Sequence, residues 1–381
     1  MALNPVTGGG PGVSVTPRDP KREAQLRRSA RWHRIDRRVS PYLYISPFYI
    51  MFAIVGLFPL VYTAFISTRQ WNVAMGNQGM AVCGLTCPSI GNTPTWYANF
   101  LWVMHQPDFW KALRNTLAIF GISTIPQLIM AMIIAYVLST KLRGATFWRM
   151  GVLLPYVLAP MALAIIFSQV FSDNLGLANT VLSWLGLPTV AWHANALASW
   201  IAISVIVNIR WTGYNALILL AAMLAIPGEL IEAAEVDGAN RVRQLFFVVI
   251  PQLRPTLVFV IITSTIGGLQ IFDEPQMFSP SSNFGGSSGQ YLTVTQFLWR
   301  TGFQSQNNAG LGRAAAMAWI LFLLVVLLVI LNFALTRRIG GDDGPGEARR
   351  KVAPAPAGAT ITSAPRGAAI SPNAKRKGEL R

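Results

Sequence analysis

The chain has 381 residues, of which 52% are hydrophobic and only 12% are charged. A soluble domain of this length carries roughly twice that charged fraction, so the composition excludes an ordinary soluble domain. The formal net charge is +16, but nine of the 31 Lys and Arg residues precede Pro41 and ten follow Leu335. Because the part between them has no basic stripe interleaved with aromatic residues, we expect no nucleic-acid partner.

The two ends of the chain differ in composition from its middle. Residues 1–41 are rich in Gly and Pro and then strongly basic. No apolar core with a small-residue cleavage site follows Met1, so we expect no cleaved secretion signal. Residues 339–381 are rich in Ala, Pro, Gly, Lys and Arg and bury too little surface to fold. We therefore predict two largely disordered tails around a folded domain over residues 42–338.

Six apolar blocks occupy that domain. With its flanks, each offers about twenty residues, the length that a helix needs to cross a lipid core of about 30 Å. Lipid offers no partner to unpaired backbone groups, so the blocks must be helical. The sequence thus predicts an all-α integral membrane protein with six transmembrane helices. Their approximate bounds are 45–66, 116–138, 151–171, 196–225, 257–272 and 314–335.

The charges of the loops predict the orientation. Residues 139–150 carry three basic residues and no acid, whereas residues 172–195 carry a single charged residue, Asp173. The positive-inside rule then places both tails, residues 139–150 and residues 226–256 in the cytoplasm. Three longer segments, 67–115, 172–195 and 273–313, face outwards. We expect a multi-pass protein of the bacterial cell membrane with both termini cytoplasmic.

The only two cysteines, Cys83 and Cys87, lie in the first outer segment. A disulfide is chemically permitted outside the cell. A bridge over three intervening residues is tight, so a disulfide and two free thiols both remain open. His33, His105 and His193 are scattered along the chain, and we therefore expect no metal site.

The inner segment 226–256 predicts two short helices joined at a glycine. Pro227 suits the first position of a helix, which then runs from Gly228 to Asp237. Gly238 ends this helix, because glycine enters the left-handed conformation cheaply. Asn240 caps a second helix that runs to about Val249. A rigid elbow of this kind fits a groove in another protein and transmits its motion.

This segment resembles the EAA motif of binding-protein-dependent ABC importer permeases. The resemblance rests on Glu232-Ala233-Ala234, on Gly238 four residues later, and on Val248-Val249-Ile250-Pro251 after nine more residues. Val248 and Ile250 are conservative departures from the family's Ile-x-Leu-Pro ending. Asp237-Gly238-Ala239 resembles the carbohydrate, maltose-type branch. The resemblance covers roughly residues 41–338, and the run from Asp108 to Thr116 resembles the entry to the family's five-helix core.

The resemblance implies a type I ABC importer permease fold and a set of partners. These are a second homologous permease subunit, two copies of an ABC ATPase subunit, an extracytoplasmic solute-binding protein, a sugar and the lipid bilayer. In the family the elbow docks into the ATPase, which assigns the coupling role to Glu232, Ala233, Ala234 and Gly238. The sequence lacks a Gly-x-x-x-x-Gly-Lys-[Ser/Thr] loop, so it is not the ATPase. We expect a non-catalytic chain that binds no cofactor itself, with ATP and Mg on the partner subunit.

Polar residues inside the fourth and fifth blocks indicate a substrate path, because such groups are costly in lipid. Aromatic rings beside amides and hydroxyls suit a sugar. The resemblance to the maltose-type permease matches Trp211, Gly213 and Ser264 to ligand contacts. The alternative, in which Trp211 and Tyr214 anchor packing, stays open. The candidate residues are Asn208, Trp211, Gly213, Tyr214, Asn215, Ser264 and Gln270.

The sequence favours a di- or oligosaccharide but does not name it. The run Phe272-Asp273-Glu274-Pro275 resembles permeases for cellobiose-like β-glucosides. A glycerol phosphate or a peptide is the alternative within the same class, although Arg210 is the only cation in the spans that could meet a phosphate. A membrane receptor or an intramembrane enzyme is disfavoured, because an enzyme needs a nucleophile with a base, or metal ligands, inside the spans. No His, Cys or Asp lies within the six blocks.

Overall fold

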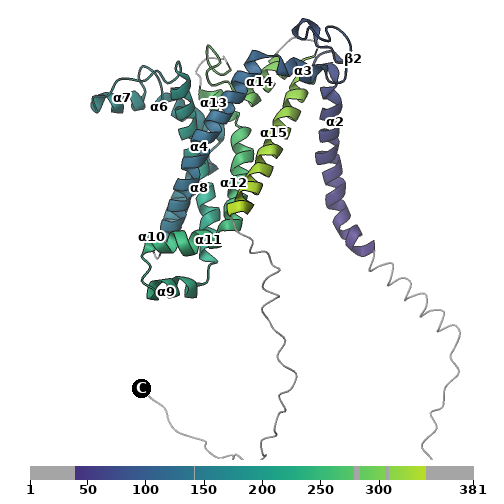
Figure 1. The fold of residues 1–381 in the computed structure, drawn as a ribbon. Coiled ribbons are helices and arrows are strands. Elements are labelled where there is room, and N and C mark those ends of the chain that lie inside the picture. Colours follow the sequence, from purple (N-terminus) through teal and green to yellow (C-terminus); the bar gives the residue numbers. More distant parts are fainter. Residues whose placement is uncertain (1–38, 141, 279–283, 305–308, 340–381) are drawn as a thin grey trace, which may run out of the picture. The chain divides into compact units, whose positions relative to one another are not determined.

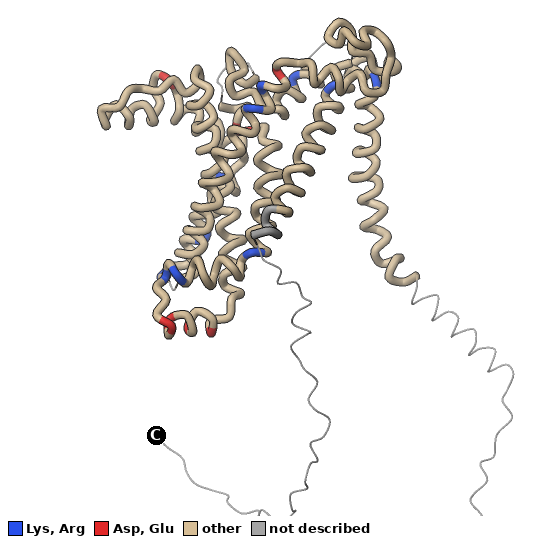
Figure 2. The backbone as a smooth tube through the Cα atoms, in the orientation of Figure 1, with Lys and Arg blue, Asp and Glu red and all other residues tan. Residues whose placement is uncertain are grey.

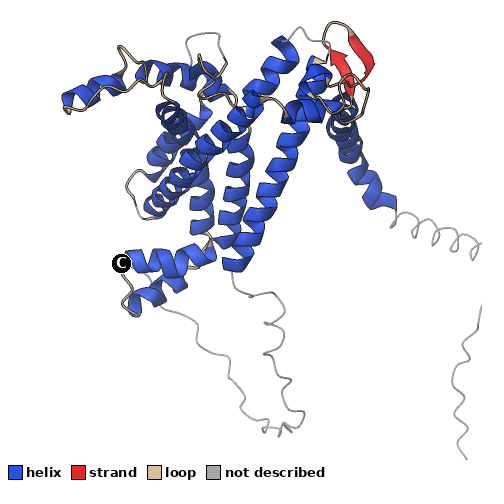
Figure 3. Ribbon diagram, turned by 45° about the horizontal axis from the view of Figure 1, so that its top comes forward, coloured by secondary structure: helices blue, strands red, loops and turns tan. Residues whose placement is uncertain are grey.

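The structure is a computed structural model that describes residues 39–140, 142–278, 284–304 and 309–339, with side chains to residue 334. The predicted disordered tails, 1–41 and 339–381, fall almost entirely outside the described residues. The described chain is predominantly helical, as predicted, with one small two-stranded sheet (Figure 3).

Within the described ranges, four helices are long and apolar enough to cross a membrane by themselves. They are Val39–Ser67, which contains a π-helical turn at Phe52–Leu57 (η1) before α2 (Phe58–Ser67), then α4 (Pro107–Ser139), α8 (Ala196–Leu224) and the Gly310–Ala334 part of α15 (Gly310–Ile339). α4 begins nine residues before the predicted block, because Pro107 occupies its first turn and Asp108 adds a favourable negative charge there. The polar run in the fourth block does not interrupt α8, which is continuous.

The third apolar block is not a single straight helix. It is divided into α5 (Ala145–Val157) and α6 (Pro160–Val170), which are bent by 90°. Ala159 precedes Pro160 and is extended, with ψ 132°. The ring of a proline excludes the helical conformation from the residue before it, which explains the break. The prediction of one span over 151–171 therefore missed this bend.

The fifth block is also preceded by a bend. The helical segment Arg241–Gln252 comprises α10 (Arg241–Gln244), a π-helical turn η3 (Leu245–Val249) and α11 (Ile250–Gln252). It meets α12 (Arg254–Leu269) at an angle of 76°. α12 ends three residues before the end of the predicted block, and a separate short helix, α13 (Asp273–Phe278), follows. The described chain reaches six spans when each bent pair counts as one.

Short elements fill the connections between the long helices. A hairpin pairs Arg69 with Met80 and Asn72 with Gly76. Cys83 and Cys87 are joined by a disulfide and are buried with Ala81 and Ala98, which decides between the two states that the sequence left open. These elements are β1 (Arg69–Asn72), β2 (Gly76–Met80), η2 (Gly84–Thr86), α3 (Ala98–Met104), α7 (Leu177–Trp184), α9 (Gly228–Val236), α14 (Val294–Trp299) and η4 (Arg300–Gln304).

The core lies around α4 and α8, which pack along each other (Figure 1). One end of α8 packs with α4, α6 and α13 through Ile119, Leu163, Ile203 and Phe278. The other end packs with α4, with α12 and with Leu253, the residue before α12, through Ala131, Leu219 and Val260. Half of the residues in the most apolar stretch of α8 are buried, at 50%, whereas only 6% are buried in the corresponding stretch of Val39–Ser67. α8 is therefore the central helix of the bundle.

Candidate functional site

The elbow over residues 226–256 contains two short helices that turn at Gly238, as predicted, although Pro227 stands just before α9 and not at its first position. α9 ends at Val236, and Gly238 follows with φ +77°, in the left-handed region that favours glycine. Asn240 caps α10, because its Oδ1 accepts a hydrogen bond from the backbone N–H of Arg243 at 2.9 Å. Acidic residues gather on α9 and basic residues begin α10 (Figure 2). The chain thus turns sharply between two short helices of unlike charge.

The four predicted coupling residues lie on the outer part of this elbow. Glu232, Ala233 and Gly238 are exposed and Ala234 is half-buried. Val236 and Phe247 are also exposed, at 88% and 79%. The elbow is nevertheless fixed to the bundle, because the hydroxyl of Tyr136 on α4 donates to the carbonyl of Arg241 at 3.0 Å. An anchored helix with an open apolar surface is suited to docking in a partner protein.

The candidate path residues on α8 form an aromatic cluster with α5. Tyr156 of α5 stacks on Tyr214, with ring centres 4.6 Å apart. Trp211 meets both rings edge-on, at 5.6 Å from Tyr156 and 5.9 Å from Tyr214. Tyr156 was not predicted from the sequence, because it lies in an apolar block and nothing in the sequence pairs it with α8. These rings hold α5 against α8 and present aromatic faces within the bundle.

Other candidate residues are placed apart from these rings. Gly213 lets α8 approach α5 closely, since a Cβ there would stand 1.9 Å from the carbonyl oxygen of Val152. Asn215 donates through Nδ2 to the hydroxyl of Ser264 at 3.1 Å and links α8 to α12 in a buried bond. Asn208 has a buried Oδ1 without a hydrogen-bond partner among the described residues. Gln270 is exposed at the end of α12 and joins none of these groups.

A polar cavity brings α4, α8 and α12 together beside Trp211. The volume of this cavity is about 10 Å³, which is room for about one water molecule. In this conformation the cavity is therefore closed to a sugar ring. Two predicted path residues, Trp211 and Ser264, line it. The complete lining is Ser123, Thr124, Gln127, Val207, Trp211, Thr263, Ser264, Gly267 and Gly268.

The contribution of α4 to this cavity was missed from the sequence. Ser123, Thr124 and Gln127 are all buried, and their spacing places them on neighbouring turns of one helix. The rule that polar groups inside a span mark a pathway applies to them as well as to α8. These three polar residues were visible in the sequence of the second block. They attracted less notice than the longer polar run in the fourth block.

An ion pair lies close to the aromatic cluster. Arg210 Nη1 of α8 is 3.0 Å from Glu274 Oε1 of α13, and the two side chains are 17% and 3% exposed. The guanidinium carbon lies 5.2 Å from the centre of the Trp211 ring. The sequence placed Glu274 in the segment 273–313, which was expected to face outwards, whereas the structure buries it and pairs it with Arg210 of the fourth block.

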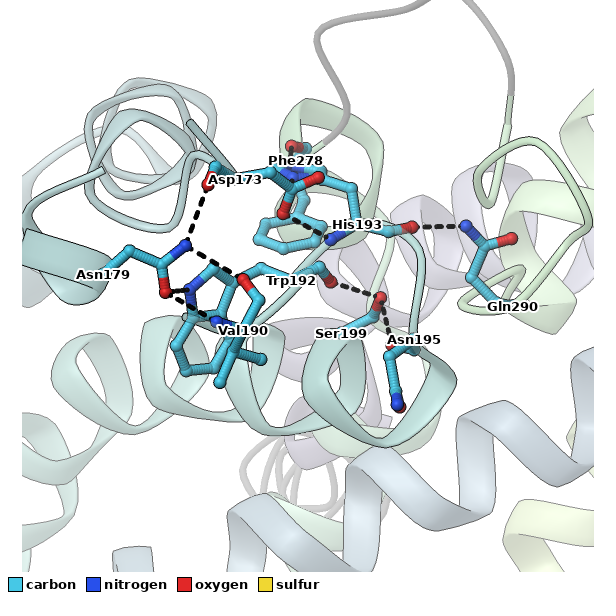
Figure 4. Close-up of polar contacts among 9 residues, drawn as sticks. All are labelled: Asp173, Asn179, Val190, Trp192, His193, Asn195, Ser199, Phe278 and Gln290. Carbon is cyan, nitrogen blue, oxygen red and sulfur yellow. Dashed lines mark hydrogen bonds and ion pairs between the residues drawn. The ribbon is translucent and has the colours of Figure 1, made fainter. Parts of the chain in front are cut away.

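The loop before α8 is fixed by a polar network, drawn in Figure 4. Asn179 of α7 uses its whole amide, donating to the carbonyls of Asp173 and Val190 and accepting from the N–H of Val190 and from Trp192 Nε1. Nδ1 of His193 lies 3.3 Å from Oδ1 of Asp173, and the side chain of Gln290 donates to the backbone carbonyl of His193. This network ties α7 and the segment before α14 to the start of α8.

Comparisons with known proteins define the class of this bundle and elbow. The family of binding-protein-dependent transport system inner membrane components matches residues 118–341, more than half of the chain. The chain belongs to that family. The match begins inside α4 and ends beyond α15, so it covers the cavity, the ion pair and the elbow. The resemblance to binding-protein-dependent importer permeases is thereby confirmed.

Curated relatives match a larger share of the chain than the family model does. The arabinooligosaccharides transport system permease protein AraP of Halalkalibacterium halodurans is 31% identical over 301 residues, covering 78% of this chain and 88% of that protein. The lactose transport system permease protein LacF of Rhizobium radiobacter is 30% identical, covering 78% and 94%. The diacetylchitobiose uptake system permease protein NgcF of Streptomyces coelicolor is 31% identical, covering 67% and 74%. These names agree with the resemblance to the carbohydrate branch.

Solved structures show the same fold. A bacterial ABC transporter involved in the import of the acidic polysaccharide alginate matches with a TM-score of 0.63 and 21% identity, covering 81% of this chain and 98% of that chain. A bacterial alginate ABC transporter in complex with an alginate pentasaccharide-bound periplasmic protein matches with a TM-score of 0.62 and 20% identity. At this identity the likeness carries the fold alone, and the expected ABC importer permease fold is confirmed.

Proposed function

We propose that this chain is one of two permease subunits of an ATP-driven sugar importer and that it carries a di- or oligosaccharide. The observation that carries the proposal is the similarity, over 78% of the chain, to permeases named for arabinooligosaccharides and lactose. The interior of the bundle supports it, because aromatic faces and hydroxyl or amide groups meet around Trp211. A sugar offers C–H faces and hydroxyls to such a surface.

The narrower substrate class is a cellobiose-like β-glucoside. Its support is the resemblance of the run Phe272-Asp273-Glu274-Pro275 to permeases for such sugars; Asp273 begins α13, and three residues separate it from the end of α12. In this run Glu274 turns inwards to Arg210, so the run contributes to the interior of the bundle. The candidate path comprises the cavity with Trp211 and Ser264, together with Asn208, Gly213, Tyr214, Asn215 and Gln270. The path opens wider than one water molecule only in another conformation of the transporter.

The elbow is the proposed coupling device. Glu232, Ala233, Ala234 and Gly238 would dock in a groove of the ATPase subunit, which holds ATP and Mg. Support comes from the exposure of α9 and from the anchoring of α10 to α4 by Tyr136. A movement of the ATPase that pushes α9 would therefore be passed to the bundle rather than lost in a loop.

The remaining partners follow from the same proposal. A second permease subunit completes the path, and an extracytoplasmic solute-binding protein delivers the sugar. Val39–Ser67 exposes most of its apolar surface, which supports a neighbour in lipid or in a second subunit. The chain would lie in the bacterial cell membrane with both termini and the elbow in the cytoplasm. The disulfide would then face the oxidising side.

An importer for glycerol phosphate or for a peptide is the alternative solute class. It would need an available cation to meet a phosphate or a carboxylate. Arg210 is matched by Glu274, which makes this alternative less supported than a neutral sugar. A membrane receptor or an intramembrane enzyme has less support still. Among the described residues, no group of three His, Cys, Asp or Glu side chains gathers to hold a metal ion.

The test is co-expression of this chain with its neighbouring transport genes, followed by purification and uptake in proteoliposomes. We expect a heteromeric complex with a second permease and two ATPase subunits. We also expect the partner binding protein to bind a di- or oligosaccharide, with cellobiose as the first probe. A functional assembly of this chain with an ATPase alone would contradict the subunit proposal. A binding protein selective for a peptide or a phosphate ester would contradict the sugar.

A further inference from the structure

The Arg210–Glu274 ion pair differs from the other arginine–carboxylate pair that the described chain forms. Arg300 and Asp108 are 2.7 Å apart, but their side chains are 37% and 52% exposed. Arg210 and Glu274 are 3.0 Å apart with exposures of 17% and 3%. The first pair lies at the surface, where ion pairs contribute little. The second stands inside a helix bundle, where each charge costs free energy to desolvate.

Packing alone does not explain the buried pair. Well-packed apolar residues of similar volume are often as stabilising as a buried ion pair, or more so. Charged groups inside membrane spans commonly line a path for a solute. Arg210 Nε is also buried without a hydrogen-bond partner among the described residues. One donor of the guanidinium is therefore unused although the group is paired.

The pair adjoins the polar cavity through Trp211. Val207 and Trp211 line the cavity, and Arg210 lies between them on α8, three residues after the first and one before the second. The guanidinium carbon is 5.2 Å from the centre of the Trp211 ring, and two atoms of that ring approach Gly267 of α12, another lining residue. Trp211 therefore joins the ion pair to the cavity that Thr124 and Ser264 line, and we call this series of groups the polar track.

We propose that Arg210 and Glu274 form a selectivity element of the path, which binds hydroxyl groups of an uncharged sugar and rejects anionic sugars. The inference rests on the proposed function as a sugar importer and deepens it. The pair offers a donor and an acceptor side by side, and neighbouring hydroxyls of a sugar need both. Trp211 supplies an aromatic face next to the pair for the C–H face of the ring.

The rejection of anions follows from the balance of charge. Glu274 matches the charge of Arg210, so the track has no net positive charge to hold a carboxylate or a phosphate. An anionic sugar would also meet the carboxylate of Glu274, and like charges in a site of low dielectric repel strongly. Removing the carboxylate of Glu274 would leave an unmatched cation, and the preference should then move towards anions.

The experiment compares two matched disaccharides on the assembled permease–ATPase complex without its binding protein, so that delivery does not set the preference. Cellobiose is the neutral probe, and cellobiouronic acid, which carries a carboxylate at C6 of one ring, is the anionic one. Saturation-transfer NMR and titration give a Kd for each. We expect the wild type to prefer cellobiose, and Glu274→Gln to shift the ratio of the two Kd values towards the acid by about tenfold.

Three further variants separate charge from packing. Asp108→Asn removes the carboxylate of the exposed pair with Arg300 and should leave the ratio unchanged. Arg210→Gln with Glu274→Gln restores neutrality and should return the ratio to near the wild-type value. Arg210→Lys keeps the charge but loses the planar fork, so it should weaken cellobiose binding several-fold and leave the rejection of the acid in place. The double variant and Arg210→Lys also test the proposal if Glu274→Gln does not assemble.

The two levels of the proposal fail in different ways. A wild-type complex that binds cellobiose, with an unchanged ratio in Glu274→Gln, would overturn the selectivity element and leave the sugar importer standing. An equal shift in Asp108→Asn would overturn it too. A wild-type complex that binds neither disaccharide, with a binding protein specific for another class of solute, would overturn both.

Discussion

The elbow and the centre of α8 lie within the same family segment and are built in opposite ways. The contacts that shape the turn of the elbow are local: the side chain of Asn240 accepts from the N–H of Arg243, and the N–H of Ala239 donates to the carbonyl of Ala234. The contacts of the α8 centre join distant parts of the chain. Arg210 and Glu274 are 64 residues apart, and Asn215 and Ser264 are 49 apart.

Exposure separates the two regions in the same way. Each residue of α9 is exposed or half-buried, whereas Gly213 and Asn215 on α8 are buried. A substitution in the elbow changes a surface that another protein would use. A substitution at the centre of α8 changes packing that holds the bundle. Loss of transport without loss of stability should therefore mark the elbow, and loss of both should mark the bundle. Four predictions test this separation.

The largest effect is expected at the turn of the elbow. Gly238→Pro replaces a residue at φ +77° with one fixed near −65° and removes an N–H that donates to Glu235. Glu232→Lys reverses an exposed charge of the motif. We expect both to abolish uptake while the level in the membrane and the unfolding midpoint stay near those of the wild type. Uptake and substrate-stimulated ATP hydrolysis in proteoliposomes are the measurements.

The matched control for this prediction is Glu235→Lys, which makes the same charge change one turn later on α9 but outside the motif. It should retain most of the uptake. Normal stimulated ATP hydrolysis in both Gly238→Pro and Glu232→Lys would refute a coupling role for the elbow.

The second effect is loss of stability at the contact of α8 with α5. Gly213→Ala places a methyl group where a Cβ would stand 1.9 Å from the carbonyl oxygen of Val152. We expect a cost of about 3 kcal/mol, the upper end for overpacking, and a lower unfolding midpoint of the purified complex. Gly121→Ala on α4 is the control, because a Cβ there meets no atom within 4 Å. Equal midpoints for the two variants would mean that α5 adjusts freely.

The third effect concerns Trp211, which belongs to both the cavity and the aromatic cluster. Trp211→Ala removes a stacking face, and aromatic contacts of this kind contribute about 1 kcal/mol beyond buried area. We expect uptake to weaken several-fold, with no change in the affinity of the external binding protein. The measurement is the rate of uptake in proteoliposomes, recorded together with the basal ATPase activity of the same complex. Loss of assembly would instead identify Trp211 as a packing anchor, and unchanged uptake would move the path towards α12.

The smallest effect is expected from Ser264→Ala on α12. It removes the acceptor of the buried hydrogen bond from Asn215, a loss of about 1 kcal/mol. The unfolding midpoint should fall slightly, and Asn215→Ala combined with Ser264→Ala should cost less than the sum of the two single changes. Additive costs would show that the bond does not couple α8 to α12.

The amino-acid sequence determined the features that depend on neighbouring residues or on lipid. The six apolar blocks follow from the length that a span requires. The elbow follows from Pro227, Gly238 and Asn240, whose conformational preferences act within a few residues. For the same reason the EAA motif could be recognised, and the family with it, before any contact between helices was known.

Only the tertiary structure decided which polar groups meet. Ala159 and Pro160 break the third block by 90°, and that bend brings Tyr156 to the rings of Trp211 and Tyr214. Thr124 and Ser264 share a cavity because α4 and α12 both pack beside α8. Glu274 reaches Arg210 because α13 returns to the bundle after α12 ends. Each outcome depends on how helices cross, and the pattern of one helix does not specify its partner.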